Sequence, residues 1–399
     1  MISSGYARLP LHYGKVPEWL YIRMEKIGLA VTELVLEESG TEGFLSRVSD
    51  PNWFQSLGCA MGMDWHSSGI TTSVLGALRR AVNTNSMSLG LHLCGGRGRY
   101  SRRTPQELTS ISEKFSLDPA PLILASRLSA KIDNSCIDDG YQLYLHTCIV
   151  DRNGNWAVVQ QGMNTEEKMA RRYHWHSQNI DSFVDNPQSA IVGKNRGIIM
   201  NMVDHRSAES RTAALDFIHQ RPDCQVRELA ALGFPVKRNL QPELFMPEHH
   251  EVTEHDVDAG RLGAVLALAY ETQVKDFSEA LLVPGIGPRT VQALGLVSEV
   301  VYGKPNRFSD PARFSFAHGG KDGHPFPVPL NTYDQTISVL SRAVKQAKLG
   351  NTEEVSAFKS LNKMTREIVS HLDPNADIDA VIKHERNISK SLGGRTCFS

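Results

Sequence analysis

The chain has 399 residues, of which 41% are hydrophobic and 22% are charged, and its formal net charge at pH 7 is -1. The length supports two or three domains with hydrophobic cores, and the composition is ordinary for a soluble globular protein. The charge balance excludes a globally basic surface, so any nucleic-acid binding requires a local patch.

The sequence carries no signal for secretion or for a membrane span. The N-terminal segment has no apolar stretch followed by a cleavage site, so we expect no signal peptide. No uncharged apolar run approaches the roughly 18 residues that a span requires. The six cysteines are scattered without a C-x-x-C pair, which argues against a zinc ribbon or an iron–sulfur site. We therefore expect a cytoplasmic protein.

The N-terminal half begins with predicted helices. The first follows Pro17 and stops at Gly40, with apolar residues at helical spacing between them. A second is predicted within residues 71–82. After a glycine- and arginine-rich loop, Thr104 starts another helix, with Glu107 at capping-box spacing.

The clearest β signal is a hairpin. The segments "YQLYLHTCIVD" and "NWAVVQQGMN" flank Asn153-Gly154, and Asn-Gly is the strongest two-residue hairpin signal. With these two residues as the loop, His146 faces Gln161 across the strands. Consecutive glutamines that leave a Val-Val strand need polar partners, which predicts a polar groove at the end of the sheet.

The stretch "ALLVPGIGPRTVQAL" has the order of a helix-hairpin-helix element. Gly285 and Gly287 permit a tight turn and the close approach of a phosphate to backbone N–H groups. Arg289 adds a positive charge, and Thr290 adds a hydrogen-bond donor. Such contacts bind the nucleic-acid backbone without reading its sequence. The alternative is a helix–helix connection with no ligand.

The residues beyond this element suggest a second chemistry. "YGKPNRFSD" places a Gly-x-Pro ahead of Asp310, which resembles the helix-hairpin-helix DNA glycosylases over 281–313. Arg289 replaces the lysine of the bifunctional members, and an arginine does not readily become a nucleophile. The resemblance therefore implies a monofunctional glycosylase that uses Asp310. The alternative role of Asp310 is a helix N-cap before Pro311.

A concentration of ionisable residues marks the N-terminal half. Carboxylates beside a lysine can hold Mg²⁺ or Mn²⁺ for phosphodiester hydrolysis. The nuclease hypothesis assigns catalytic roles to Asp64, His66, Lys131, Asp133, Asp139 and His146, and metal ligation to Asp64, Asp133 and Asp139. The alternative is that one polar helix stripe is simply a solvated face; it comprises Arg127, Lys131, Asn134 and Asp138.

The loop "GGRGRYSRR" supplies a candidate basic patch. It contains Arg97, Arg99, Arg102 and Arg103 with Tyr100 between them. Such a loop can follow phosphates, although an exposed basic loop that binds nothing is also common.

Long motifs across the chain resemble one family. "DPNWFQSLGCAMGMDWHSSGITT", "SRLSAKIDNSCIDDGYQLY", "WAVVQQGMNTEEKMARRYHW" and "FSFAHGGKDGHPFPVP" are similar to the bacterial and archaeal family catalogued as domain of unknown function 763. The resemblance implies a helix-hairpin-helix-like segment and transfers no catalytic residue. The loop from Ala317 to Pro329 has no assigned role, because an anion-binding nest and simple packing fit it equally.

The sequence thus predicts an α+β fold, with a mixed helix and β-hairpin domain followed by a mainly helical C-terminal domain. The expected boundaries are 1–220, a connecting segment 221–255, and 256–399. The leading function is a DNA-processing or DNA-repair enzyme, a nuclease dependent on Mg²⁺ or Mn²⁺ that grips the DNA backbone. The alternatives are a glycosylase that uses Asp310 and a non-catalytic DNA-binding module. We expect DNA, and no membrane, as the partner.

Overall fold

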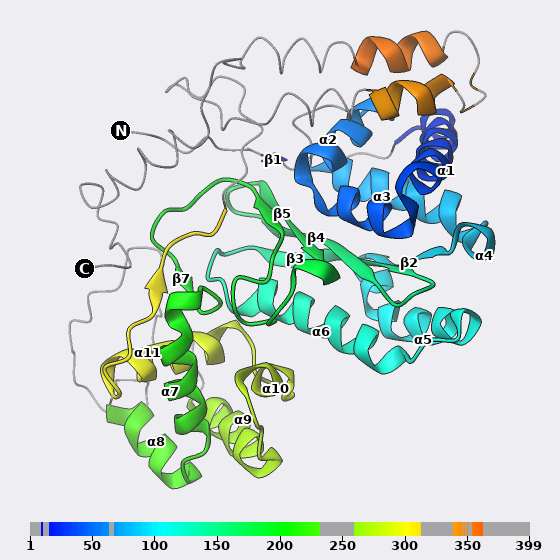
Figure 1. The fold of residues 1–399 in the computed structure, drawn as a ribbon. Helices are drawn as coiled ribbons and strands as arrows, with labels where there is room; N and C mark the ends of the chain where they lie inside the picture. The colour runs from blue at the N-terminus through cyan, green and yellow to red at the C-terminus, as the bar shows by residue number, and fades with distance from the viewer. Residues whose placement is uncertain are drawn as a thin grey trace, which may run out of the picture.

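The computed structural model describes residues 9–10, 16–63, 68–231, 259–312, 338–345, 347, 349 and 353–361. An antiparallel sheet carries helices on both faces, and further helices gather beyond one of these layers (Figure 1). This arrangement confirms the predicted α+β fold class, with a mainly helical region after the sheet. None of the described helices combines the length and the apolar character needed to cross a membrane.

The main sheet has the strand order β1-β5-β4-β3-β2, with β6 also paired to β5, and β7 pairs with β8 in a separate ribbon. All of these pairs are antiparallel. The strands are β1 (Leu9–Pro10), β2 (Leu91–Arg97), β3 (Gln142–Asp151), β4 (Trp156–Asn164), β5 (Met169–His176), β6 (Ala190–Val192), β7 (Met200–Asn201) and β8 (Arg307–Phe308).

The predicted hairpin is formed by β3 and β4, but its register was predicted wrongly by one residue. His146 pairs with Gln160 rather than with the residue after it. The Asp151 N–H donates to the Asn155 carbonyl at 2.9 Å, so the loop contains the three residues between them. Gly154 closes this loop in the left-handed region, with φ of 86°. A three-residue loop of this kind shifts the pairs from Leu145 onward by one position, and a β-bulge between Leu143 and Leu145 shifts the last two pairs by one more.

The helices on the first face of the sheet come from the N-terminal segment. They are α1 (Glu18–Ser49), α2 (Pro51–Ala60), α3 (Gly69–Asn83) and the short α4 (Ser86–Leu89). Gly40 interrupts α1 with φ of 67° and ψ of -171°, at the position where the sequence predicts a helix stop. The glycine tolerates this conformation because it has no Cβ.

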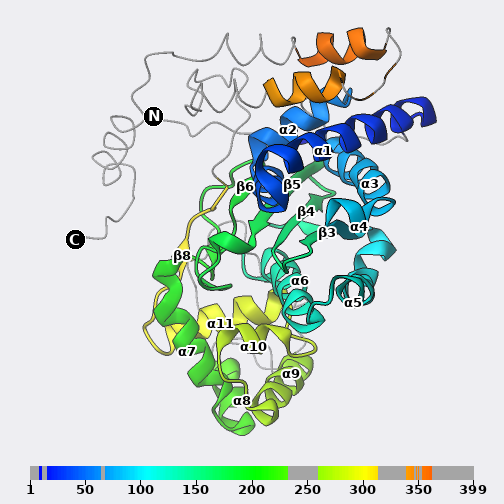
Figure 2. The ribbon, with the colours of Figure 1, turned by 45° about the vertical axis from the view of Figure 1, so that its right-hand side comes forward.

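The opposite face is covered by α5 and α6, and α7 to α11 form a further layer against α6 (Figure 2). These helices are α5 (Thr104–Phe115), α6 (Pro119–Ser135), α7 (Ala208–Ile218), α8 (Pro222–Ala231), α9 (Ala259–Thr272), α10 (Phe277–Leu282) and α11 (Pro288–Val300). Short 3₁₀ turns occur at η1 (Gly98–Arg103), η2 (Ser177–Asn179) and η3 (His205–Ser207). Since α7 packs on α11, helices from both sides of the predicted connecting segment share one layer.

The last described helical residues return to the N-terminal helices (Figure 1). Leu340 and Val344, from the predicted apolar stripe, are buried in the same hydrophobic cluster as α1, α2 and α3. Arg342 also forms an ion pair with Glu38 of α1. The described residues of the predicted C-terminal helices therefore contribute to the N-terminal core.

Candidate nucleic-acid interface

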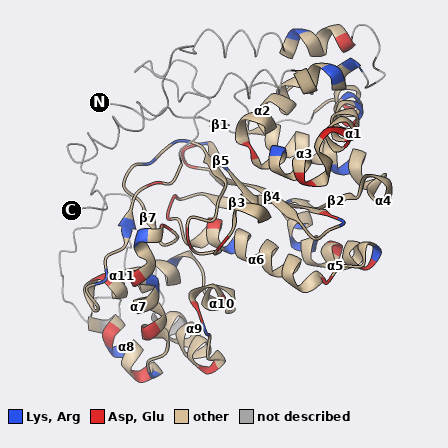
Figure 3. Cartoon of the chain, viewed as in Figure 1, with Lys and Arg blue, Asp and Glu red and all other residues tan. Residues whose placement is uncertain are grey.

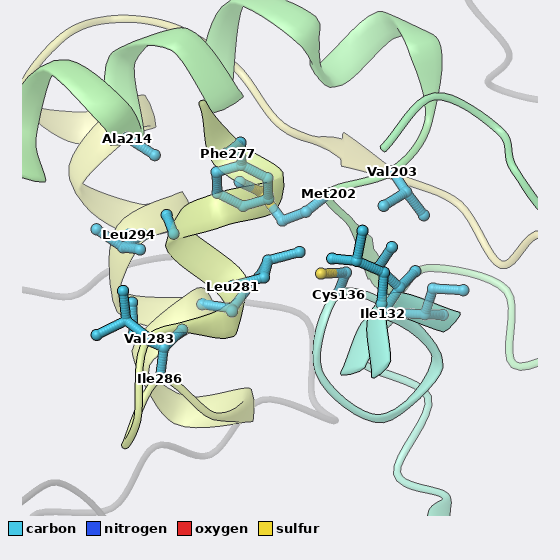
Figure 4. Close-up of a cluster of buried hydrophobic side chains, with 14 of the residues drawn as sticks. Ile132, Cys136, Met202, Val203, Ala214, Phe277, Leu281, Val283, Ile286 and Leu294 are labelled. Carbon is cyan, nitrogen blue, oxygen red and sulfur yellow. The ribbon is translucent and has the colours of Figure 1, made fainter. Parts of the chain in front are cut away.

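The Pro-Gly-Ile-Gly stretch forms a tight turn between α10 and α11, which we call the glycine hairpin (Phe277–Val300). Two of its side chains anchor the turn to the hydrophobic core. Val283 and Ile286 are buried, and Figure 4 shows them on the same side of the turn, near Leu294 of α11. The Ile286 N–H also donates to the Val283 carbonyl at 3.2 Å. The turn is therefore packed against the hydrophobic core on one side.

The two glycines of the hairpin have different requirements. Gly285 has φ of 93°, and a Cβ at this position would lie 2.6 Å from Cγ2 of Val265 in α9. Only glycine satisfies both the backbone conformation and the close approach of α9. Gly287 has extended backbone and is the N-cap of α11. Its nearest neighbour would be the Gly285 carbonyl at 3.9 Å, so a side chain fits there.

The tip of the hairpin faces solvent. Pro284, Gly285, Pro288 and Arg289 are exposed, whereas Thr290 is buried. The first turn of α11 lies directly behind this tip; its first residue, Pro288, contributes no N–H, and the later N–H groups of a helix's first turn have no partner within their own helix. These groups and the helix dipole make the tip suitable for an anion such as a phosphate. The predicted contacts of Gly285, Gly287 and Arg289 are compatible with this geometry.

The arginine-rich loop forms a 3₁₀ turn, η1, between β2 and α5. Four arginines of this loop are exposed, namely Arg97, Arg99, Arg102 and Arg103. The predicted capping box at Thr104 does not form: one Glu107 oxygen accepts from the Gly95 N–H at 2.7 Å and the other pairs with Arg79 at 2.7 Å. Glu107 therefore fixes the base of the arginine turn instead of capping α5.

Asp133 lies in the core between α6 and the sheet. One carboxylate oxygen accepts from Gln188 Nε2 at 2.7 Å, and the other accepts from Trp175 Nε1 at 2.8 Å and from Gln160. Burial raises the pKa of Asp133 to about 7, although these three donors oppose the shift. Because protein donors surround both oxygens, a metal ion would have to displace them.

Asp139 belongs to a buried ionic cluster on the same face of the sheet. Its Oδ2 accepts from Arg171 Nη1 at 2.9 Å and from the Tyr173 hydroxyl at 2.6 Å. Its Oδ1 accepts from the Tyr141 N–H at 3.0 Å. Burial raises the pKa of Asp139, and Arg171 counteracts this.

Asp310, the candidate glycosylase residue, closes this cluster from the other side of Arg171. Its Oδ1 accepts from Arg171 Nη1 at 3.1 Å and from the Ala312 N–H at 2.8 Å. Its Oδ2 accepts from Arg171 Nη2 at 2.6 Å and from the Arg196 N–H at 2.7 Å. Burial opposes the charge of Arg171, but the two aspartates raise its pKa above its ordinary value. The bond to Ala312 resembles the predicted capping role of Asp310, and the ion pair fixes the carboxylate.

His146 is also buried. Its Nδ1 lies 2.7 Å from Gln160 Oε1 and its Nε2 lies 2.8 Å from the Ser126 hydroxyl, and burial lowers its pKa. Lys131 is half-buried, and burial lowers its pKa as well. The described residues contain no group of three histidines, cysteines or carboxylates arranged to hold a metal ion. Asp64 and His66 lie outside the described residues, as does the loop from Ala317 to Pro329.

The two glutamines after the Val-Val strand do not line one groove. Gln160 faces α6 and donates to the Ser129 carbonyl at 2.9 Å, whereas Gln161 faces α3 and donates to the Ser68 carbonyl at 3.1 Å. Both are fully buried. The predicted polar groove at the sheet end is therefore wrong, because alternate residues of a strand point to opposite faces.

The sequence did not identify the partners that saturate these carboxylates. Arg171 and Trp175 belong to β5, and Gln188 and Arg196 lie in the segments around β6. The only available signal was the alternation along β5, which places Arg171, Tyr173 and Trp175 on one face. Pairing them with particular aspartates requires the tertiary structure.

Comparison with known proteins establishes the family. The family model described as "Protein of unknown function (DUF763)" matches residues 5–328, so the chain belongs to this family. No curated protein and no solved structure matches the chain. The family resemblance expected from the long motifs is confirmed, and the functional assignments depend on the chain's own geometry.

Proposed function

We propose that the protein binds DNA through its backbone, using the glycine hairpin. The observation that supports the proposal is the combination of a turn anchored by Val283 and Ile286 with an exposed glycine tip at the start of α11. An anchored turn presents its N–H groups without an ordering cost on binding. Contacts of this type do not depend on base sequence, so the expected affinity is similar for unrelated duplexes.

Gly287→Asp tests the proposal without damaging the fold. The extended backbone of this N-cap position has room for a side chain, and aspartate is a favoured N-cap. The new carboxylate would satisfy the N–H groups of α11 and repel a phosphate. We expect unchanged or slightly higher stability and at least a roughly tenfold loss of duplex affinity, measured by fluorescence anisotropy.

Two controls separate charge from shape. Gly287→Asn places a neutral side chain of the same size at the N-cap and should weaken binding less than aspartate does. Arg227→Ala removes an exposed arginine of α8, distant in sequence from the hairpin, and should leave the affinity unchanged. Equal binding by the wild-type protein and Gly287→Asp would rule out the hairpin as the contact.

DNA cleavage stays a prediction from the sequence. The nuclease hypothesis requires Asp133 and Asp139 to exchange their protein donors for a metal ion, and the glycosylase hypothesis requires Asp310 to leave its ion pair with Arg171. Incubation of the protein with labelled DNA in Mn²⁺, Mg²⁺ or EDTA, followed by alkali, distinguishes the two. Metal-dependent breaks abolished by Asp133→Asn would support a nuclease, and alkali-dependent breaks in EDTA would support a glycosylase.

A further inference from the structure

The arginine turn, residues 97–103, is the most concentrated positive charge among the exposed loops described. We infer that this turn binds a single-stranded segment of nucleic acid, with phosphates held by its arginines and a base stacked beside Tyr100. This inference rests on the proposed function, because that function supplies the class of ligand, nucleic acid. It names a second, separate contact and the strand form that this contact accepts.

The geometry of the turn brings the cations to one aromatic ring. The guanidinium carbons of Arg99 and Arg103 each lie 5.4 Å from the centroid of the Tyr100 ring, and that of Arg79 lies 6.0 Å from it. Tyr100 is 39% exposed in spite of these neighbours. Arg97 lies over Tyr144 instead, at 5.9 Å.

The turn is rigid enough to act as a site. The Ser101 hydroxyl donates to the Gly98 carbonyl at 2.6 Å, and the Thr104 hydroxyl donates to the Ser101 carbonyl at 2.7 Å. Gly95 has φ of 90°, and a Cβ there would lie 2.4 Å from the His146 carbonyl oxygen. Strand β2 can therefore enter the turn only because this residue is glycine.

The charges of the turn are not balanced locally. Among the described residues, no carboxylate lies within ion-pair distance of the turn's four arginines, whereas Arg79 is paired with Glu107. Arg99 and Arg103 approach the same ring, so the distance between their guanidinium groups is comparable to or shorter than the Debye length, about 10 Å at 0.1 M salt. Their repulsion is relieved when a polyanion binds. Elsewhere, acidic and basic residues are intermixed along the helices (Figure 3).

The exposed aromatic ring favours a single strand over a duplex. A duplex hides the faces of its bases and offers mainly phosphates, whereas a single strand can stack a base on an aromatic or guanidinium plane. Arg79 also lines an open hollow of about 500 Å³ together with Glu25, Arg80, Asn83 and Thr84. Arg79 belongs to α3 and its guanidinium also approaches the Tyr100 ring, so the hollow lies beside the turn, and a flexible strand can follow such a surface.

The test compares binding of a labelled 20-nucleotide oligo-dT and of a labelled duplex. Tyr100→Ala should weaken oligo-dT binding by roughly tenfold, since stacking contributes about 1–3 kcal/mol per base, and Tyr100→Phe should retain it. The Arg99→Gln, Arg103→Gln double variant should make the slope of log affinity against log salt shallower by about 1.4. These side chains are exposed, so circular dichroism should show an unchanged fold.

The outcomes distinguish this inference from the proposed function. Loss of oligo-dT binding in Tyr100→Ala, with duplex binding lost only in Gly287→Asp, supports both. If Gly287→Asp retains duplex binding while Tyr100→Ala loses oligo-dT binding, only the hairpin proposal fails. If Tyr100→Ala and the double arginine variant bind oligo-dT as the wild-type protein does, the inference is overturned. If the wild-type protein binds neither the oligo-dT nor the duplex, both the inference and the hairpin proposal are overturned.

Discussion

Replacing Asp310 with asparagine distinguishes a structural carboxylate from a catalytic one. Both oxygens of Asp310 accept two hydrogen bonds, and its ion pair with Arg171 is completely buried. An asparagine NH₂ in either position would therefore face two donors. Breaking a buried pair by removing one partner costs about 3–5 kcal/mol. Arg171 keeps Asp139 at 2.9 Å and the Lys194 carbonyl at 2.6 Å, so we expect a loss near the lower end, about 3 kcal/mol.

Urea unfolding followed by circular dichroism measures this loss. Asp223→Asn is a matched control, because Asp223 is an exposed residue of α8 whose ion pairs face solvent. It should change the free energy of unfolding very little. If Asp310→Asn were as stable as the wild-type protein and only base excision were lost, Asp310 would be a catalytic residue and the structural interpretation would be refuted.

Three further predictions concern a buried carboxyl group and two glycines. The pKa of Asp133 is raised to about 7 in the folded state, so its contribution to stability is present below its unfolded pKa, near 3.8, and is lost as pH rises toward 7. As the pH rises from 4.5 to 7.5, the free energy of unfolding of Asp133→Asn should therefore increase by about 3 kcal/mol relative to that of the wild-type protein, as measured by urea unfolding. The asparagine fits the site because the Gln188 amide can rotate to accept from it. Parallel pH profiles of stability for the two proteins would contradict this prediction. Gly285→Ala should lower the free energy of unfolding by about 3 kcal/mol, because of the positive φ and the contact with Val265. Equal melting temperatures of this variant and the wild-type protein would show that α9 can move to accommodate the added Cβ. Gly154→Ala has the same backbone strain in more open space and should cost only about 1 kcal/mol, so a loss as large as that of Gly285→Ala would contradict the packing argument.

Local signals in the sequence predicted the elements well. Pro17 and Gly40 delimit the first helical segment, and the Asn-Gly pair marks the β3–β4 turn. The register could not be predicted, because the same Asn-Gly pair is compatible with a two-residue and with a three-residue loop. That choice depends on whether Asp151 pairs with Asn155.

The candidate sites also differ in how far local sequence could predict them. The glycine hairpin and the arginine turn are continuous in sequence, so their form could be anticipated from local chemistry. The sequence predicts Asp133 and Asp139 as metal ligands because it does not show what surrounds them. Their partners Trp175 and Arg171 are distant in sequence, and these partners determine whether a buried carboxylate is saturated or available.

The return of the C-terminal helices to the N-terminal core was also not predictable. The apolar stripe with Leu340 and Val344 indicates an amphipathic helix but does not identify the surface that it covers. In the structure this surface includes α1, where Glu38 pairs with Arg342.

The measurement that tests the central claim most directly is the salt dependence of duplex DNA binding by the wild-type protein and by Gly287→Asp. We predict that the wild-type protein binds unrelated duplexes with similar affinity and that this affinity falls steeply with salt. We also predict that Gly287→Asp binds at least roughly tenfold more weakly without losing stability. Identical titrations for the two proteins, or no binding by the wild-type protein at low salt, would contradict the assignment of the glycine hairpin as a DNA contact.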